Sequence, residues 1–294
     1  MRAVPCILGP LKLGTSNLEE RGLSVGGVDQ ITTPAELALD LDAAKSTCRT
    51  FIQEQFKAIG AECAILGLSG GIDSALVAYL TADALGPDRL RTFILPYRTS
   101  APTSRTDALS VATALGCSVE EIPISAALDA VEAALPGGES LSPIRRGNIA
   151  ARLRMITLYD QSARYNGLVM GTGNKTEAMI GYTTIHGDAA CAMNPIGDLY
   201  KSHVRALAAH LGVPSGIITK APSADLWPGQ TDEGEGGFDY PTLDRILLRL
   251  VDQGKSAASI VAEGFDGELV ARVVSMMSQS QFKRQMPPFP KIST

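Results

Sequence analysis

The stretch Cys63-Ala64-Ile65-Leu66-Gly67-Leu68-Ser69-Gly70-Gly71-Ile72-Asp73-Ser74 decides the fold of this chain. Its first six residues are a short apolar run that closes in glycine, which is typical of a buried parallel strand. A helix is predicted directly after it, over 73–85, ending at Gly86-Pro87. Glycines let backbone N–H groups approach an anion closely, and a helix N-terminus directs further N–H groups to the same place. The stretch therefore predicts a phosphate-binding loop at the carboxyl end of a strand.

The side chains of this loop strengthen the phosphate interpretation. Ser69 and Ser74 offer hydroxyl donors, and Asp73 makes sense among phosphates if it holds Mg²⁺, which takes carboxylate and phosphate oxygens together. The loop lacks the Gly-Lys-Ser/Thr ending of a Walker loop and the G-x-G-x-x-G dinucleotide fingerprint. The alternative is a plain glycine-rich turn capped by Asp73, and the two flanking serines make it the less favoured interpretation.

Strands and helices alternate along the rest of the chain. Besides the strand at 63–68, strands are predicted at 90–95, 118–124, 167–172 and, as a short fifth strand, 193–196. Helices are predicted from Thr33 to Ile59 and at 73–85, 103–115, 145–165, 174–180, 201–211, 241–253 and 266–280. The alternation predicts an α/β fold with a doubly wound parallel sheet of about five strands and extra C-terminal helices.

The composition sets limits on the domain organisation and on the partners. The chain has 294 residues, of which 45% are hydrophobic and 19% charged, so we expect an irregular extension at 1–34, one domain at 35–285 and an extended tail at 286–294. The net charge of −5 gives no general basic footprint for nucleic acid. Five scattered cysteines without a C-x-x-C pair, no membrane-length apolar run and no convincing signal peptide favour a cytoplasmic protein without a membrane partner.

Several motifs together resemble a known family. Ser69-Gly70-Gly71-Ile72-Asp73-Ser74 resembles the pyrophosphatase loop of the N-type ATP pyrophosphatases, an adenine-nucleotide alpha-hydrolase-like group that includes NAD, GMP, asparagine and argininosuccinate synthetases. Further stretches, in the order of the family, are similar to NAD synthetases in particular: 147–155 (GNIAARLRM), 171–177 (GTGNKTE), 181–182 (GY), 186–188 (HGD) and 220–233 (KAPSADLWPGQTDE). The resemblance covers about residues 36 to 285.

The resemblance implies an ammonia-dependent NAD synthetase, a ligase that uses ATP as co-substrate. The nicotinate carboxylate of deamido-NAD would attack the α-phosphate of ATP, giving an adenylate and pyrophosphate, and ammonia would then give NAD and AMP. The resemblance also implies a homodimer with deamido-NAD bound across the interface. Residues 1–34 are too few to form a fused amidase domain, so we expect either free ammonia or delivery by a separate glutaminase subunit.

The resemblance also implies the site residues. Asp73 and Glu177 would be the Mg²⁺ ligands, and Asp73, Lys201 and Asp188 the catalytic groups. The ATP-binding residues would be Gly67, Ser69, Gly70, Gly71, Ser74, Leu95, Arg152, Thr172, Lys201 and Ser223. The deamido-NAD-binding residues would be Arg152, Asp188, Lys283 and Arg284.

Each of these residues also has a purely structural interpretation. Glu177 is an acid in a first helical turn, which the helix dipole favours by itself. Lys201 at a helix start is unfavourable for the dipole, which favours a nearby phosphate. Asp188 follows glycine as turn aspartates do, and Lys283 and Arg284 could be a solvated terminal pair.

Arg152 and Arg154 are two residues apart, so they project about 200° apart on a helix and cannot face one ligand equally. We assign Arg152 to the nucleotide and Arg154 to a structural salt bridge. Leu95 could line the adenine pocket or pack in the core, Thr172 could be a polar strand end, and Ser223 a turn serine.

Two other functions are open on the sequence. The first is another adenylate-forming N-type ATP pyrophosphatase, and the second is a non-catalytic nucleotide-binding relative. The second is motivated by Ala192, which stands where the family commonly has a second aspartate. The intact set of Ser69, Asp73 and Glu177 argues against it.

Overall fold

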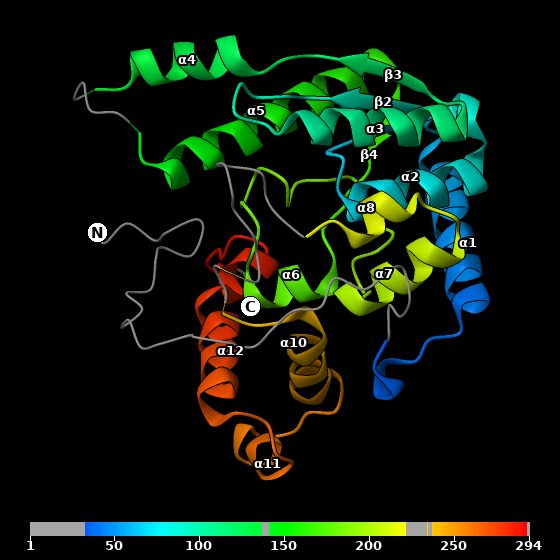
Figure 1. Ribbon diagram of the computed structural model, residues 1–294. Helices are drawn as coiled ribbons and strands as arrows, with labels where there is room; N and C mark the ends of the chain where they lie inside the picture. The colour runs from blue at the N-terminus through cyan, green and yellow to red at the C-terminus, as the bar shows by residue number, and fades with distance from the viewer. Residues whose placement is uncertain (1–32, 137–140, 222–233, 235–236, 293–294) are drawn as a thin grey trace.

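Four parallel strands form one sheet in the computed structural model, which describes residues 33–136, 141–221, 234 and 237–292 (Figure 1). They are β1 (Cys63–Gly67), β2 (Leu90–Ile94), β3 (Ser118–Glu121) and β4 (Gly167–Val169), in the order β3-β2-β1-β4. The parallel α/β prediction is confirmed, but the fifth strand is not. Met193 forms only an isolated parallel bridge with Met170, and Pro195, two residues on, has no N–H to extend a ladder.

The central strand positions the glycine loop. Ile65 of β1 is paired with Arg91 of β2 on one side and with Val169 of β4 on the other. The first four residues of β1 are buried, as expected for a central parallel strand covered on both faces. All carboxyl ends lie at one edge of the sheet because the strands are parallel, so the loop that follows β1 lies at that edge.

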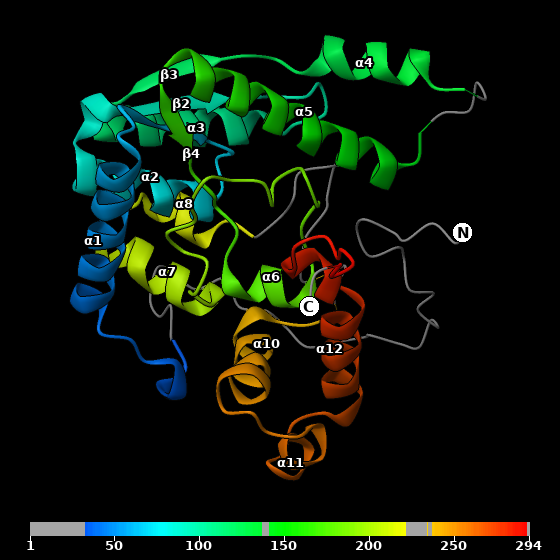
Figure 2. The same ribbon diagram turned by 180° about the vertical axis from the view of Figure 1, so that it is seen from behind.

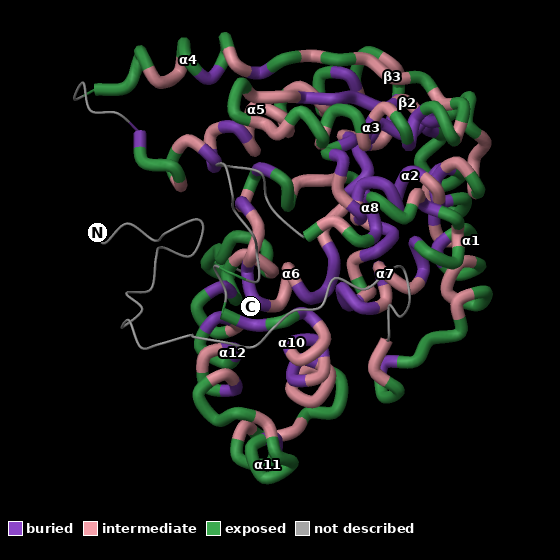
Figure 3. Tube along the Cα trace, in the orientation of Figure 1, coloured by how far each residue is buried: buried purple, intermediate pink, exposed green. Residues whose placement is uncertain are grey.

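Helices cover both faces of the sheet (Figures 1 and 2). One face carries α2 (Ile72–Leu85) and α3 (Pro102–Leu115), and the other carries α5 (Pro143–Arg164) with α4 (Ser125–Ala134) beside it. Two more helices, α1 (Leu41–Ile59) and α7 (Lys201–His210), pack against the outer side of α2. As a result α2 is largely buried (Figure 3), which explains why it is apolar around most of its circumference.

The C-terminal helices form a second packed group with its own core, below the sheet in Figure 1. They are α10 (Tyr240–Leu247), the π-helical turn η3 (Leu248–Asp252), α11 (Ala257–Ala262), α12 (Gly267–Gln279) and the 3₁₀ turn η4 (Gln281–Arg284). They pack on the short helix α6 (Lys175–Ile180), and through α10 also on α7. Among the described residues, no helix has both the length and the apolarity to cross a membrane.

Several element boundaries differ from the sequence predictions. The helix predicted from Thr33 to Ile59 is a 3₁₀ turn η1 (Ala35–Leu37) followed by α1, which starts after Asp40. The side chain of Asp40 accepts a hydrogen bond from the Ala43 N–H at 3.0 Å, and this cap makes a new start more favourable than a continuous helix. The 3₁₀ turn η2 (Pro87–Arg89), the short helix α8 (Ser215–Thr219) and the helices α4 and α11 were not predicted.

Candidate active site

The glycine loop is held in shape by its two serines. The Ser69 N–H donates to Ser74 Oγ at 3.2 Å, Ser74 Oγ donates to the Gly71 carbonyl at 3.0 Å, and the Gly71 N–H donates to Ser69 Oγ at 3.2 Å. Gly70 has a φ of +77°, and a Cβ placed there would lie 2.2 Å from the Ser104 carbonyl oxygen. Only glycine fits this position, both for its backbone angle and for its contact with α3.

Two carboxylates and one ammonium meet beside this loop. Asp73 is in the first turn of α2, Glu177 in the first turn of α6, and Lys201 is the first residue of α7. Lys201 Nζ donates to Asp73 Oδ2 at 2.6 Å and to Glu177 Oε1 at 3.0 Å. The structure thus brings together three predicted site residues from three separate helix starts.

Lys201 is held here as a buried cation, with 2% of its side chain exposed. Burial by itself lowers a lysine pKa, but the charges of Asp73 and Glu177 outweigh it, and the pKa of Lys201 is raised above its ordinary value. Lys201 is therefore an ammonium ion at neutral pH, and it balances the two carboxylates.

The donor set fits a magnesium ion that arrives with a phosphate ligand. The described residues contain no group of three His, Cys, Asp or Glu side chains that could hold a metal alone. Asp73 and Glu177 nevertheless direct carboxylate oxygens at one cation, the ammonium of Lys201. Mg²⁺ is commonly bound through one or two carboxylates, with substrate phosphates and water completing its shell.

Asn174 was missed by the sequence reasoning, although it contacts this cluster. Its Nδ2 donates to Asp73 Oδ1 at 2.9 Å, and its Oδ1 accepts from the Glu177 N–H at 3.0 Å. Glu177 Oε2 accepts from the Asn174 N–H at 3.4 Å, which completes a capping box. The N-x-x-E spacing from Asn174 to Glu177 was the available signal, because it is typical of such a box.

Arg152 and Arg154 diverge, as the helical spacing predicts. Arg154 Nε donates to the Leu95 carbonyl at 3.0 Å, whereas an Arg152 guanidinium nitrogen donates to the Ile185 carbonyl at 3.2 Å. Leu95 itself is buried, with 7% exposed, and belongs to the core under α5. An adenine contact by Leu95 and a nucleotide contact by Arg152 remain predictions.

Gly67 and Thr172 lie close to the carboxyl edge that carries the loop. Gly67 is the last residue of β1, and a Cβ added to it would approach Leu158 Cδ1 to 3.3 Å. Thr172 follows β4 after two residues and is half-buried. Ser223 lies outside the described residues.

Asp188, Lys283 and Arg284 are engaged with the backbone near the end of α6. Asp188 is exposed and accepts from Thr183 Oγ1 at 2.6 Å and from the Thr184 N–H at 2.8 Å. Lys283 Nζ donates to the carbonyls of Gly181 and Thr183 at 2.8 and 2.7 Å. Arg284 donates to backbone carbonyls at the ends of α6 and α12, and burial lowers its pKa. These three residues lie together, at the opposite end of α6 from Glu177.

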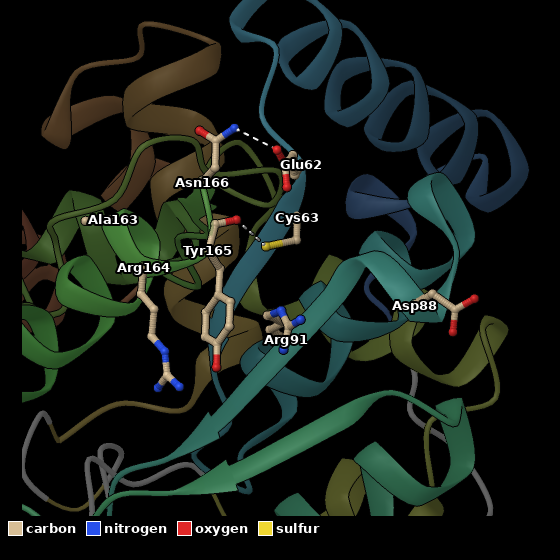
Figure 4. Close-up of a pocket in the computed structure, with 8 residues that line it drawn as sticks. All are labelled: Glu62, Cys63, Asp88, Arg91, Ala163, Arg164, Tyr165 and Asn166. Atoms are coloured by element: carbon tan, nitrogen blue, oxygen red, sulfur yellow. Dashed lines mark hydrogen bonds between the residues drawn. The ribbon is translucent and has the colours of Figure 1, made fainter.

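A polar hollow at the opposite edge of the sheet contains none of the predicted residues (Figure 4). It has a volume of about 490 Å³ and is lined by residues at the amino ends of β1, β2 and β4. Tyr165 lies there with the guanidinium groups of Arg91 and Arg164 at 4.0 and 4.8 Å from its ring centroid. Its hydroxyl donates to Glu120 at 3.1 Å, so these groups stabilise one another. Ligands of parallel α/β sheets bind at the other edge, where the carboxyl ends of the strands lie.

The fold and the site define a class of protein. A parallel α/β sheet, a glycine loop at the carboxyl end of its central strand and two carboxylates beside that loop are the parts of a nucleotide-binding enzyme site. Comparison with known proteins makes the family specific. The chain belongs to the NAD synthase family, whose model matches residues 45–287.

Individual relatives agree with this family. The chain is 49% identical over 243 residues to an NH(3)-dependent NAD(+) synthetase of Trichlorobacter lovleyi, covering 83% of this chain and 88% of the relative. It is 44% identical over 257 residues to one of Fusobacterium nucleatum, covering 87% and 98%.

Solved structures show the same fold. An NH3-dependent NAD synthetase of Campylobacter jejuni matches with a TM-score of 0.74 and 36% identity, over 86% of this chain and all of that one. An NMN synthetase of Francisella tularensis matches with a TM-score of 0.77 and 32% identity, over 87% of this chain and all of that one.

Proposed function

We propose that this protein converts deamido-NAD to NAD in an ATP-dependent amidation, with ammonia as the nitrogen donor and AMP and pyrophosphate as products. The observation that carries the proposal is the convergence of Asp73 and Glu177 on one cation beside a phosphate-type glycine loop. The relatives named above as NH(3)-dependent synthetases support both the reaction and the nitrogen donor. Ligase chemistry of this kind needs no covalent protein nucleophile.

The chain's own residues would bind and orient the triphosphate. The free N–H groups at the start of α2 and the serine hydroxyls of the loop would bind the β- and γ-phosphates. Mg²⁺ held by Asp73 and Glu177 would neutralise phosphate charge and so make pyrophosphate a better leaving group. The ammonium of Lys201 would leave the carboxylates for a phosphate oxygen, because the metal would take its place between Asp73 and Glu177.

The acceptor end of the site is assigned to the residues near the end of α6. We place the deamido-NAD phosphates near Lys283 and Arg284, the nicotinate near Asp188, and Arg152 between the two substrates. Lys283 and Arg284 are consecutive residues, and together they contact the end of α6 and the residues after it, beside the segment that carries Asp188. Their backbone hydrogen bonds fix their positions before any substrate binds.

We further propose a homodimer. The long helix α5 exposes Ile156 (57%) and Tyr159 (39%) on neighbouring turns. A second copy of the chain could cover this exposed apolar surface. Measurement of the molar mass by light scattering, on the wild-type protein and Ile156→Asp, tests this. A monomeric wild-type protein would contradict it.

The test of the function is a turnover assay with purified protein, ATP, Mg²⁺ and either ammonium or glutamine. We expect NAD and AMP in equal amounts with ammonium and deamido-NAD, and none with glutamine alone. Asp73→Ala should lower the rate roughly 100-fold or more. The matched control is Asp83→Ala, which changes an aspartate of the same helix that pairs with Lys45 at 3.0 Å and should retain the rate.

A second candidate is favoured by one observation, the structural similarity to an NMN synthetase. The same assay therefore includes nicotinate mononucleotide as a competing acceptor. A higher kcat/KM for the mononucleotide than for deamido-NAD would replace the first proposal by this one. Absence of AMP with both acceptors would exclude both.

A further inference from the structure

Asp244 is a buried carboxylate to which the proposed reaction gives no role. It lies in α10, has no exposed surface, and accepts three hydrogen bonds. Thr176 Oγ1 donates to its Oδ1 at 2.5 Å, and the N–H and the hydroxyl of Ser202 both donate to its Oδ2 at 2.7 Å. One carboxylate from the C-terminal helices thus contacts the starts of both α6 and α7.

The residues that Asp244 holds are the sequence neighbours of the two charged groups in the site. Thr176 directly precedes Glu177, and Ser202 directly follows Lys201. Thr176 Oγ1 also accepts from the N–H of Lys201 at 2.9 Å. The Thr176 hydroxyl therefore links Asp244 to the backbone N–H of Lys201 by hydrogen bonds. The same threonine is the residue directly before Glu177, so Asp244 is connected to both members of the Glu177–Lys201 pair.

A second carboxylate from the same part of the chain repeats this pattern. Asp252, in the π-helical turn η3, accepts from Lys175 Nζ at 2.7 Å and from the Tyr200 hydroxyl at 2.9 Å. Lys175 lies two residues before Glu177, and Tyr200 directly precedes Lys201. Single π-helical turns within α-helices are frequent at functional sites.

The burial of Asp244 argues for a role other than stability. Burial raises the pKa of this carboxyl in spite of its three hydrogen bonds, so its charge costs folding free energy at neutral pH. An apolar side chain of similar size would avoid that cost but could not accept from Thr176 and Ser202. The carboxylate is therefore explained by the geometry that it imposes.

We propose that Asp244 is a positioning residue, which fixes α6 against α7 and thereby sets the spacing of Glu177 and Lys201 for the metal and the phosphates. Asp252 supports the same spacing from η3. This inference rests on the proposed metal site and deepens it, because it names the groups outside the site on which its affinity depends.

The experiment measures Mn²⁺ binding by electron paramagnetic resonance, in the presence of a non-hydrolysable ATP analogue, for a set of variants. Asp244→Asn keeps the shape but presents an N–H donor where a hydrogen bond must be accepted. Thr176→Val removes the bridging hydroxyl at nearly constant volume, and Thr176→Ser restores it. Loss of such outer contacts should raise the Kd for Mn²⁺ by roughly 10- to 100-fold.

Asp239→Ala is the matched control. Asp239 is exposed and caps α10 by accepting from the Thr242 N–H at 2.8 Å, so this variant weakens the same helix without touching α6 or α7. We expect wild-type Mn²⁺ affinity from Asp239→Ala and Thr176→Ser, and weakened binding from Thr176→Val and Asp244→Asn. Hydrogen exchange at the Lys201 and Ser202 amides should be faster in Thr176→Val and Asp244→Asn, and unchanged in the other two variants.

The outcomes separate this inference from the metal site itself. If Glu177→Gln lowers Mn²⁺ affinity and Thr176→Val does not, Asp244 is not a positioning residue although the metal site stands. If Glu177→Gln leaves Mn²⁺ binding unchanged, the metal site is wrong. Equal loss of affinity in Thr176→Val and Thr176→Ser would also contradict the inference, because the restored hydroxyl would then have no effect.

Discussion

Replacement of Lys201 by methionine should make the stability of the protein depend more strongly on magnesium. Lys201 Nζ lies 2.6 Å from Asp73 and 3.0 Å from Glu177, so Lys201→Met leaves two carboxylates facing each other without a cation. Methionine fills a similar volume, which limits the effect of an empty cavity. The expected result is a protein that is less stable than wild type without divalent metal and gains more stability from Mg²⁺.

The magnitude follows from the burial of the three groups. Removing one partner of a buried ion pair costs about 3–5 kcal/mol when the remaining charge is fully buried. The side chains of Asp73 and Glu177 are 19% and 17% exposed, and Asp73 keeps the hydrogen bond from Asn174. We therefore expect a loss of about 2–3 kcal/mol, at or below the lower limit of that range.

The assay is urea unfolding at neutral pH, with and without Mg²⁺. A metal present at 100 times its Kd adds about 2.7 kcal/mol to the free energy of unfolding. In Lys201→Met the metal would enter a site with no competing ammonium, whereas in the wild-type protein it must displace Lys201. Magnesium should therefore stabilise the variant more than the wild-type protein.

The control is Lys45→Met, which removes a half-buried surface lysine that pairs with Asp83 at 3.0 Å. A surface pair of this kind contributes about 0–1 kcal/mol, and no magnesium dependence is expected from it. If Lys201→Met is as stable as wild type without metal, or if magnesium stabilises both proteins equally, then Lys201 is not the cation that balances Asp73 and Glu177 in place of a metal.

Two further predictions concern backbone and pH. Gly70→Ala places a Cβ 2.2 Å from the Ser104 carbonyl and should destabilise the protein by more than about 2 kcal/mol and abolish turnover. Gly60→Ala is the control, because Gly60 has a similar φ of +76° but lies in open space. In the same thermal melt it should lose only the stability that backbone strain costs. Burial lowers the pKa of His203, so the unfolded chain takes up the proton first and unfolding becomes easier as the pH falls below about 6.5. Urea titrations between pH 7.5 and 5.5 measure the free energy of unfolding, which should fall less with pH in His203→Gln than in the wild-type protein. An equal fall in both proteins would contradict a role of His203 in this pH dependence.

Local features of the sequence predicted the parts of the fold that depend on neighbouring residues. The strand, glycine loop and helix at 63–85 carry their own apolar run, turn residues and stop signal, and the structure has them within one residue. The divergence of Arg152 and Arg154 followed from helical spacing alone. The helix start at Asp40 was missed because a strong cap signal at Thr33 competed with it.

Contacts between distant residues could not be derived from the sequence pattern. Lys201 meets Asp73 across 128 residues, and only the family resemblance placed them together. Asp244 gave no signal, because an acid in an amphipathic helix is ordinarily solvated and the partners of Asp244 are 68 and 42 residues away. Lys283 appeared equally suited to solvent, whereas the structure directs it to two backbone carbonyls.

We propose above all that Asp73 and Glu177 hold the metal that accompanies ATP on the glycine loop. Its most direct test is a crystal structure with Mn²⁺ and a non-hydrolysable ATP analogue, in which anomalous scattering locates the metal. We expect a peak bonded to oxygens of both carboxylates and of the triphosphate, with Lys201 Nζ moved to a phosphate. A peak away from both carboxylates, with Lys201 still between them, would contradict it.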